Sequence, residues 1–119
     1  MSIQTMAAKT AEVLRARRWT NCGDFVDDDG CVCLLGALGV AAFNDPNIFR
    51  DSDVDTLNNE DATALHNRLL LDERIKHEGS VAEWNDSLGL VTPILALLDR
   101  IAGEKMEPCS FDVDDAELV

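Results

Sequence analysis

The sequence predicts a mostly α-helical fold, a compact bundle of about four helices. Apolar residues recur at helical spacing in four segments, residues 3–18, 32–43, 61–77 and 93–102. Mostly short polar stretches connect these segments, as is typical of helix bundles. With 119 residues, of which 46% are hydrophobic, the chain has the size and composition of a single domain that folds without metal or disulfides.

The first helix is expected over residues 3–18, with Ser2 as its N-cap. Its charged face carries Lys9, Arg15 and Arg18, and Trp19 ends it by folding back on the core. The inward-facing positions should be Ile3, Met6, Ala7, Val13 and Leu14.

Residues 20–30 form a polar connection that ends in an Asp-Gly turn signal. A short β-hairpin can form there, because apolar pairs at 25–26 and 31–32 flank the turn. The uncharged segment 32–43 is typical of a buried helix, and its glycines Gly36 and Gly39 indicate that another backbone packs closely against it. Asn44, Asp45 and Pro46 should end this helix.

Residues 44–60 are expected to be a long acidic loop, followed by one continuous helix over residues 61–77. Ser80 and Glu83 match a capping box, which predicts a short helical turn. Thr92 and Pro93 begin the last helix, which should bury Ile94, Leu95, Leu98 and Ile101. Residues 1–103 are therefore predicted to form a single helical domain, and residues 104–119 an acidic C-terminal tail.

The net charge of −13 disfavours direct binding to nucleic acid or to an anionic membrane, since both need basic residues. The charge is uneven: residues 1–20 carry a net +3, residues 21–61 a net −9 and residues 104–119 a net −5. A cationic protein partner, association between two copies, or plain solubility fits this distribution.

The sequence predicts a cytoplasmic protein. The first 20 residues lack the apolar centre of a signal peptide, and no segment reaches the roughly 20 apolar residues that cross a bilayer. The four cysteines, Cys22, Cys31, Cys33 and Cys109, are therefore expected to be reduced.

These cysteines do not match a zinc site, because only one close pair exists and structural zinc sites usually show two. A nucleophilic thiol is a weaker alternative to a structural role. Cys31 or Cys33 would lie near a helix N-terminus, which lowers a thiol's pKa, and His66 would have to approach it through folding. No nucleophile motif surrounds either cysteine, so no catalytic residue, metal or cofactor is predicted.

The acidic runs do not match a calcium loop. The series Asp51, Asp53 and Asp55 lacks the central glycine and the terminal glutamate of that loop. These three residues stay candidates for binding a partner or a cation, against the alternative of a solvated loop.

Trp84, Asn85 and Asp86 form the most distinctive local cluster. Tryptophan dominates interface hot spots, which makes this cluster and Trp19 candidate binding residues. In the alternative interpretation, Trp84 is buried and the two polar side chains bind nearby backbone.

The same residues carry a family resemblance over roughly residues 8–103. Arg18-Trp19-Thr20, the stretch from Gly30 to Leu38, the stretch from Val81 to Asp86 and the last helix follow one another in a fixed order. This order resembles an uncharacterised family of small proteins from actinobacteria and their phages, with a Trp-Thr element, a Cys-x-x-Gly-Ala-Leu element and a Trp-Asn-Asp element. Arg18 departs from the pattern, which has glycine before the tryptophan, and Cys33 is an extra cysteine.

The resemblance implies a phage or host origin rather than an activity. It favours a non-catalytic accessory protein that binds a host protein in the host cytoplasm and forms a homodimer in one version of this hypothesis. Two alternatives stay open: a small thiol- or metal-dependent enzyme using Cys31 or Cys33 with His66, and an acidic DNA mimic that inhibits a DNA-binding protein.

Overall fold

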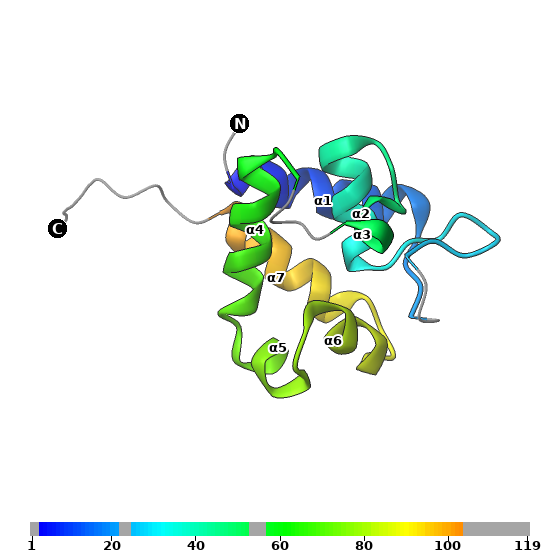
Figure 1. Cartoon of the computed structure of the whole chain (residues 1–119). Coiled ribbons are helices and arrows are strands. Elements are labelled where there is room, and N and C mark those ends of the chain that lie inside the picture. Colours follow the sequence, from blue (N-terminus) through cyan, green and yellow to red (C-terminus); the bar gives the residue numbers. More distant parts are fainter. Residues whose placement is uncertain (1–2, 22–24, 53–56, 104–119) are drawn as a thin grey trace, which may run out of the picture.

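The computed structural model describes residues 3–21, 25–52 and 57–103, apart from the side chain of Asp51. These ranges are mostly helical, as predicted, but hold seven helices rather than four (Figure 1). The helices are α1 (Ile3–Arg17), α2 (Leu34–Phe43), α3 (Ile48–Asp51), α4 (Glu60–Leu70), α5 (Glu73–Glu78), α6 (Val81–Ser87) and α7 (Thr92–Ala102). The predicted N-cap Ser2 and the tail 104–119 lie outside the described residues.

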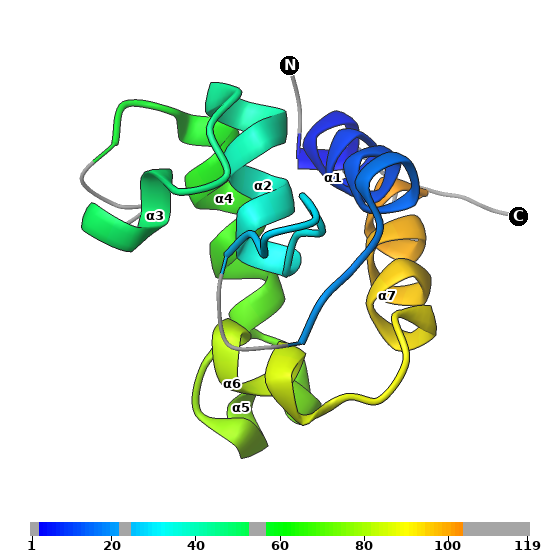
Figure 2. The ribbon, with the colours of Figure 1, turned by 90° about the vertical axis from the view of Figure 1, so that its right-hand side faces the viewer.

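Helix α1 is the centre of the packing. It lies against α7 and α2, and also contacts α4, so the first and last helices of the fold are neighbours (Figure 2). The helices share one apolar core, and burying each large aliphatic side chain in it contributes about 1.5–3 kcal/mol. Its largest fully buried members are Met6, Leu34, Leu38, Leu65, Leu69, Ile75, Ile94, Leu97, Leu98 and Ile101.

The chain turns sharply after α1, because Arg18 adopts a left-handed backbone conformation with a φ of 70°. Two isolated bridges follow: Trp19 pairs in parallel with Val32, and Val26 pairs with the same Val32 in antiparallel fashion. The described residues contain no longer strand at this place, so the predicted hairpin is reduced to single bridges around a turn at Gly30, whose φ is 86°.

Helix α2 begins at a thiol cap and lies close to two other backbone segments. The Sγ atom of Cys33 accepts a hydrogen bond from the backbone N–H of Gly36. A Cβ atom on Gly36 would collide with the carbonyl oxygen of Phe25, and one on Gly39 with that of Asp45. This confirms the close packing predicted from the two glycines. The helix ends at Asn44 in a left-handed cap, also as predicted.

Two predictions about the middle of the chain were wrong. The expected loop over residues 44–60 contains the short helix α3. The helix expected over residues 61–77 is two helices, because Leu71 ends α4 and the carboxylate of Asp72 caps α5 by accepting from the N–H of Arg74 at 2.9 Å. The apolar spacing continues through this break, which explains why it was missed.

The last two helices follow their sequence signals. The hydroxyl of Ser80 accepts from the N–H of Glu83 at 3.1 Å, which confirms the Ser80 half of the predicted capping box. The same hydroxyl donates to the Glu83 carboxylate at 3.1 Å. In α7 the buried residues include Leu97 rather than Leu95, which is only partly buried. The prediction of the other three inward positions, Ile94, Leu98 and Ile101, was correct.

Candidate functional site

Asn85 joins three distant parts of the chain. Its side-chain oxygen accepts hydrogen bonds from the indole N–H of Trp19 at 2.7 Å and from the backbone N–H of Leu34 at 3.0 Å. Its amide nitrogen donates to the carbonyl of Thr20 and to the carboxylate of Asp86. The residue is 1% exposed, and its two donor and two acceptor positions are all used by hydrogen bonds within the fold.

The other candidates of this cluster separate. Asp86 is exposed, whereas Trp84 is buried, with 2% of its surface accessible. The guanidinium of Arg74 lies over the Trp84 ring, 5.3 Å from its centre, as in a cation–π contact. Trp19 is partly buried, and its indole N–H donates to the side chain of Asn85.

A hollow of about 410 Å³ lies next to Trp84, and we call it the α6 hollow. Trp84 and Leu88 are its apolar lining residues, and its charged lining residues come from α5. Protein–protein interfaces also combine apolar and charged side chains. The complete lining is Glu73, Arg74, His77, Glu78, Trp84, Ser87 and Leu88.

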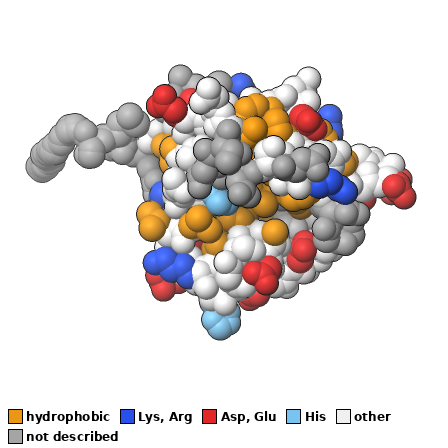
Figure 3. All heavy atoms as spheres, in the orientation of Figure 1, with side chains coloured by type: hydrophobic (Ala, Val, Ile, Leu, Met, Phe, Trp, Pro, Cys, Tyr) orange, Lys and Arg blue, Asp and Glu red, His pale blue; other side chains and the backbone are white. Residues whose placement is uncertain are grey.

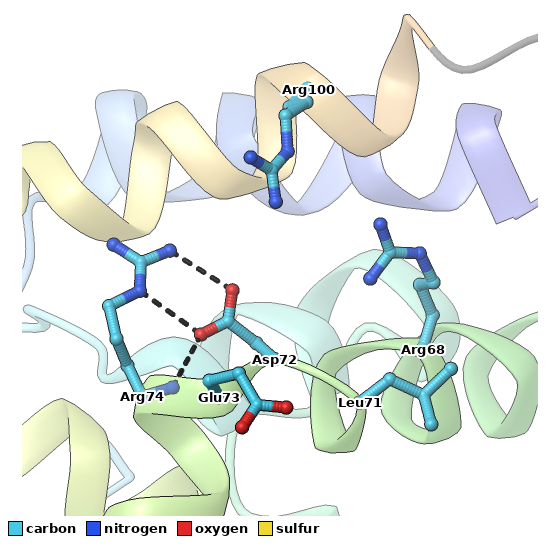
Figure 4. A pocket seen from close by; sticks show the side chains of 6 residues that line it. All are labelled: Arg68, Leu71, Asp72, Glu73, Arg74 and Arg100. Carbon is cyan, nitrogen blue, oxygen red and sulfur yellow. Dashed lines mark hydrogen bonds and ion pairs between the residues drawn. The ribbon is translucent and has the colours of Figure 1, made fainter.

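A second hollow of about 490 Å³ lies between α7 and the junction of α4 with α5, and we call it the arginine hollow. Three guanidinium groups face the space between these helices: Arg68 from α4, Arg74 from α5 and Arg100 from α7 (Figure 4). The rest of its lining is Leu71, Asp72 and Glu73. Three of the ten basic residues of a strongly acidic chain thus gather at one place.

Asp72 holds Arg74 in position. The guanidinium donates to both carboxylate oxygens, at 3.0 and 3.1 Å, while the Asp72 side chain is only 7% exposed. The hydrogen bonds from Arg74 hold the pKa of Asp72 below its usual value. Because Arg74 lines both hollows, this pair forms the wall between them.

The two described thiols do not form an activated nucleophile. Burial raises the pKa of the Cys33 thiol, and desolvation with the nearby Asp27 and Asp29 carboxylates raises that of Cys31. A nucleophilic cysteine needs the opposite shift. Because the pKa of each thiol is raised, both thiols stay protonated at neutral pH. The Cys33 sulfur caps α2 instead. Cys22 and Cys109 lie outside the described residues.

Metal ligands do not gather in the described ranges either, where no group of three His, Cys, Asp or Glu side chains comes together. Asp27 and Asp45 serve the backbone, since Asp27 accepts from the N–H groups of Asp29 and Cys31, and Asp45 from that of Asn47. The candidates Asp53 and Asp55, and the side chain of Asp51, lie outside the described residues.

Apolar and acidic side chains occupy different parts of the surface face seen in Figure 3. Hydrophobic side chains gather over the middle of the face in Figure 3, and acidic side chains lie mostly towards its edge. No helix in the described part of the chain is long and apolar enough to cross a membrane.

Sequence reasoning missed the arginine hollow. Nothing in the spacing of Arg68, Arg74 and Arg100 along the sequence shows that three helices bring them together. The one local signal was Asp72, a good capping residue inside a helical pattern.

A family model covers the described fold. A model of a family of unknown function, DUF6197, matches residues 2–104. The chain belongs to this family. The DUF6197 match spans every described helix, both hollows and Asn85, and leaves most of the acidic tail outside. No curated protein and no solved structure matches the chain.

Proposed function

We propose that this member of DUF6197 is a non-catalytic accessory protein of phage type that acts by binding a host protein in the host cytoplasm. The observation that carries the proposal is the α6 hollow, which combines the apolar side chains of Trp84 and Leu88 with charged residues of α5. Hot spots of protein interfaces have this composition, with an aromatic centre and polar surroundings. The protonated thiols argue against the alternative of a thiol enzyme.

The partner should present an apolar side chain flanked by basic residues. The apolar side chain would contact Leu88, which is partly buried, beside Trp84, and the basic residues would meet Glu73 and Glu78, which also line the hollow. The net charge of −13 would speed the encounter with such a partner at low ionic strength. An acidic DNA mimic would share this salt dependence, but would bind through the 21–61 segment instead of the α6 hollow.

Affinity capture from actinobacterial lysate tests the proposal when it compares two leucine variants. Leu88→Lys places a charge in the α6 hollow, whereas Leu90→Lys changes a nearby leucine that is 69% exposed and does not line it. We expect the same host protein to be captured by the wild type and by Leu90→Lys and to be lost with Leu88→Lys. Equal capture by both variants, or no specific capture, would contradict the proposal.

Two further measurements complete the test. His77→Lys changes an exposed lining residue of the α6 hollow. It therefore tests whether this surface is needed for capture without disturbing the core that Leu88 packs against. Light scattering of the wild type and Leu88→Lys shows whether the partner at this face is a second copy of the chain. A dimer that Leu88→Lys dissociates would replace the host partner with self-association.

A further inference from the structure

The arginine hollow is a second surface, which shares Glu73 and Arg74 with the α6 hollow. Its three guanidinium groups come from α4, α5 and α7 and face one space (Figure 4). Asp72 neutralises Arg74 through two hydrogen bonds, and Arg100 is exposed and forms no ion pair with another described residue.

The chemistry of this hollow specifies its ligand. Guanidinium groups bind carboxylates through paired N–H donors, so a ligand with several carboxylates is favoured. Leu71 lies at the same hollow and is 63% exposed, which gives the ligand an apolar contact beside its charges. A polypeptide segment that carries several carboxylates beside apolar side chains would supply both kinds of contact.

The sequence of the chain itself contains such a segment. Residues 111–118 read Phe-Asp-Val-Asp-Asp-Ala-Glu-Leu, with four acidic residues, four apolar ones and no basic residue. We propose that residues 111–118 bind the arginine hollow of the same chain. Their carboxylates pair with Arg68 and Arg100, and one of their apolar side chains contacts Leu71.

The length of the connection supports binding within one chain. Arg100 lies in the last turn of α7, which ends at Ala102, and Phe111 follows eight positions after Gly103. Eight residues span at most about 26–29 Å when extended, which is enough to return to a hollow that α7 itself lines. A tether of this length also raises the effective concentration of the segment to the millimolar range.

A nitroxide spin label on Cys109, two residues before the segment, tests this proposal in the full chain. Cys22 and Cys31 are replaced by serine, while Cys33 is buried and its raised pKa keeps it unreactive. We expect the label to broaden the backbone amide signals of residues 68–74. The broadening should be lost in Arg68→Gln/Arg100→Gln and kept in the matched control Lys9→Gln/Arg17→Gln, which removes the same charge from α1.

A second variant tests the ligand without changing the folded domain. Replacing the four acidic residues of the segment, Asp112, Asp114, Asp115 and Glu117, by their amides should also abolish the broadening. About 1 M salt should weaken it, since the screening length falls to about 3 Å. Broadening that is unaffected by these changes overturns the proposal. In a mixture of isotope-labelled chains without spin label and spin-labelled chains without isotope label, broadening would show binding between two chains and would also overturn it. The spin-label experiment does not depend on a host protein. Its result therefore stands even if the proposed function fails.

Discussion

The indole N–H of Trp19 donates a 2.7 Å hydrogen bond to the side-chain oxygen of Asn85, 66 residues further along the chain. The same oxygen accepts from the backbone of Leu34 at the start of α2. Three sequence elements that resemble a family pattern, around Trp19, Leu34 and Asn85, therefore meet at one buried amide. This part of the motif describes a folding contact, whereas Trp84 of the same element also lines the α6 hollow.

We expect Asn85→Ala to lower the free energy of unfolding by about 2–3 kcal/mol. The substitution leaves the buried N–H of Leu34 and the indole N–H without their acceptor, and each unsatisfied group costs about 1–3 kcal/mol before relaxation. Urea unfolding measures the change. Asn67→Ala, at an exposed position of α4, is the control and should change stability by less than about 0.5 kcal/mol. Equal effects of the two variants would contradict a structural role for Asn85.

Local signals in the sequence predicted the helices whose ends they mark. The Ser80–Glu83 capping box, the Asn44 stop and the apolar spacing of α1, α2 and α7 all predicted elements that the structure contains. The break at Asp72 was missed because Leu65, Leu69 and Ile75 keep a helical period across it. The two hollows depend on how α4, α5, α6 and α7 pack, which no single segment encodes.

Gly36→Ala should destabilise the protein by about 1–3 kcal/mol, the usual cost of overpacking. The new methyl group would meet the carbonyl oxygen of Phe25, which accepts the N–H of Cys33 and cannot withdraw without breaking that bond. Gly89→Ala is the matched control, because no atom lies within 4 Å of the added methyl group. Thermal unfolding should show a lowered Tm for Gly36→Ala alone, and a Tm equal to that of the control would refute the close approach.

Arg18→Gly should stabilise the protein by about 0.5–1 kcal/mol. The left-handed conformation at Arg18 costs a side-chain-bearing residue about 1–2 kcal/mol, and part of this gain is lost to the greater freedom of glycine in the unfolded chain. Asn44→Gly is the comparison, since asparagine tolerates the same conformation and should gain less. The midpoints of urea unfolding test this prediction. A lower urea midpoint for Arg18→Gly than for the wild type would exclude backbone strain at this residue.

Asp72 should make stability depend on pH in the acid range. Its pKa in the folded state lies below the usual 3.8, so the unfolded chain binds the proton more readily. The contribution of Asp72 is fully present above the unfolded pKa and is lost as the pH falls through the folded one. Asp72→Asn keeps a cap on α5 but loses this dependence, so its difference from the wild type should shrink on acidification. A difference between the two proteins that stays the same on acidification would contradict the prediction.

At alkaline pH the buried thiol of Cys33 should have the opposite effect. Burial raises its folded-state pKa above the usual 9.0, so the native state holds the proton that the unfolded state releases. Stability from this thiol is present below pH 9 and declines as the pH rises towards the folded pKa. Cys33→Ser retains a hydroxyl that can accept from the N–H of Gly36 but does not ionise in this range. Between pH 7 and about pH 10, the wild type should therefore lose more unfolding free energy than Cys33→Ser, and parallel profiles would show that the thiol ionises equally well in the folded protein.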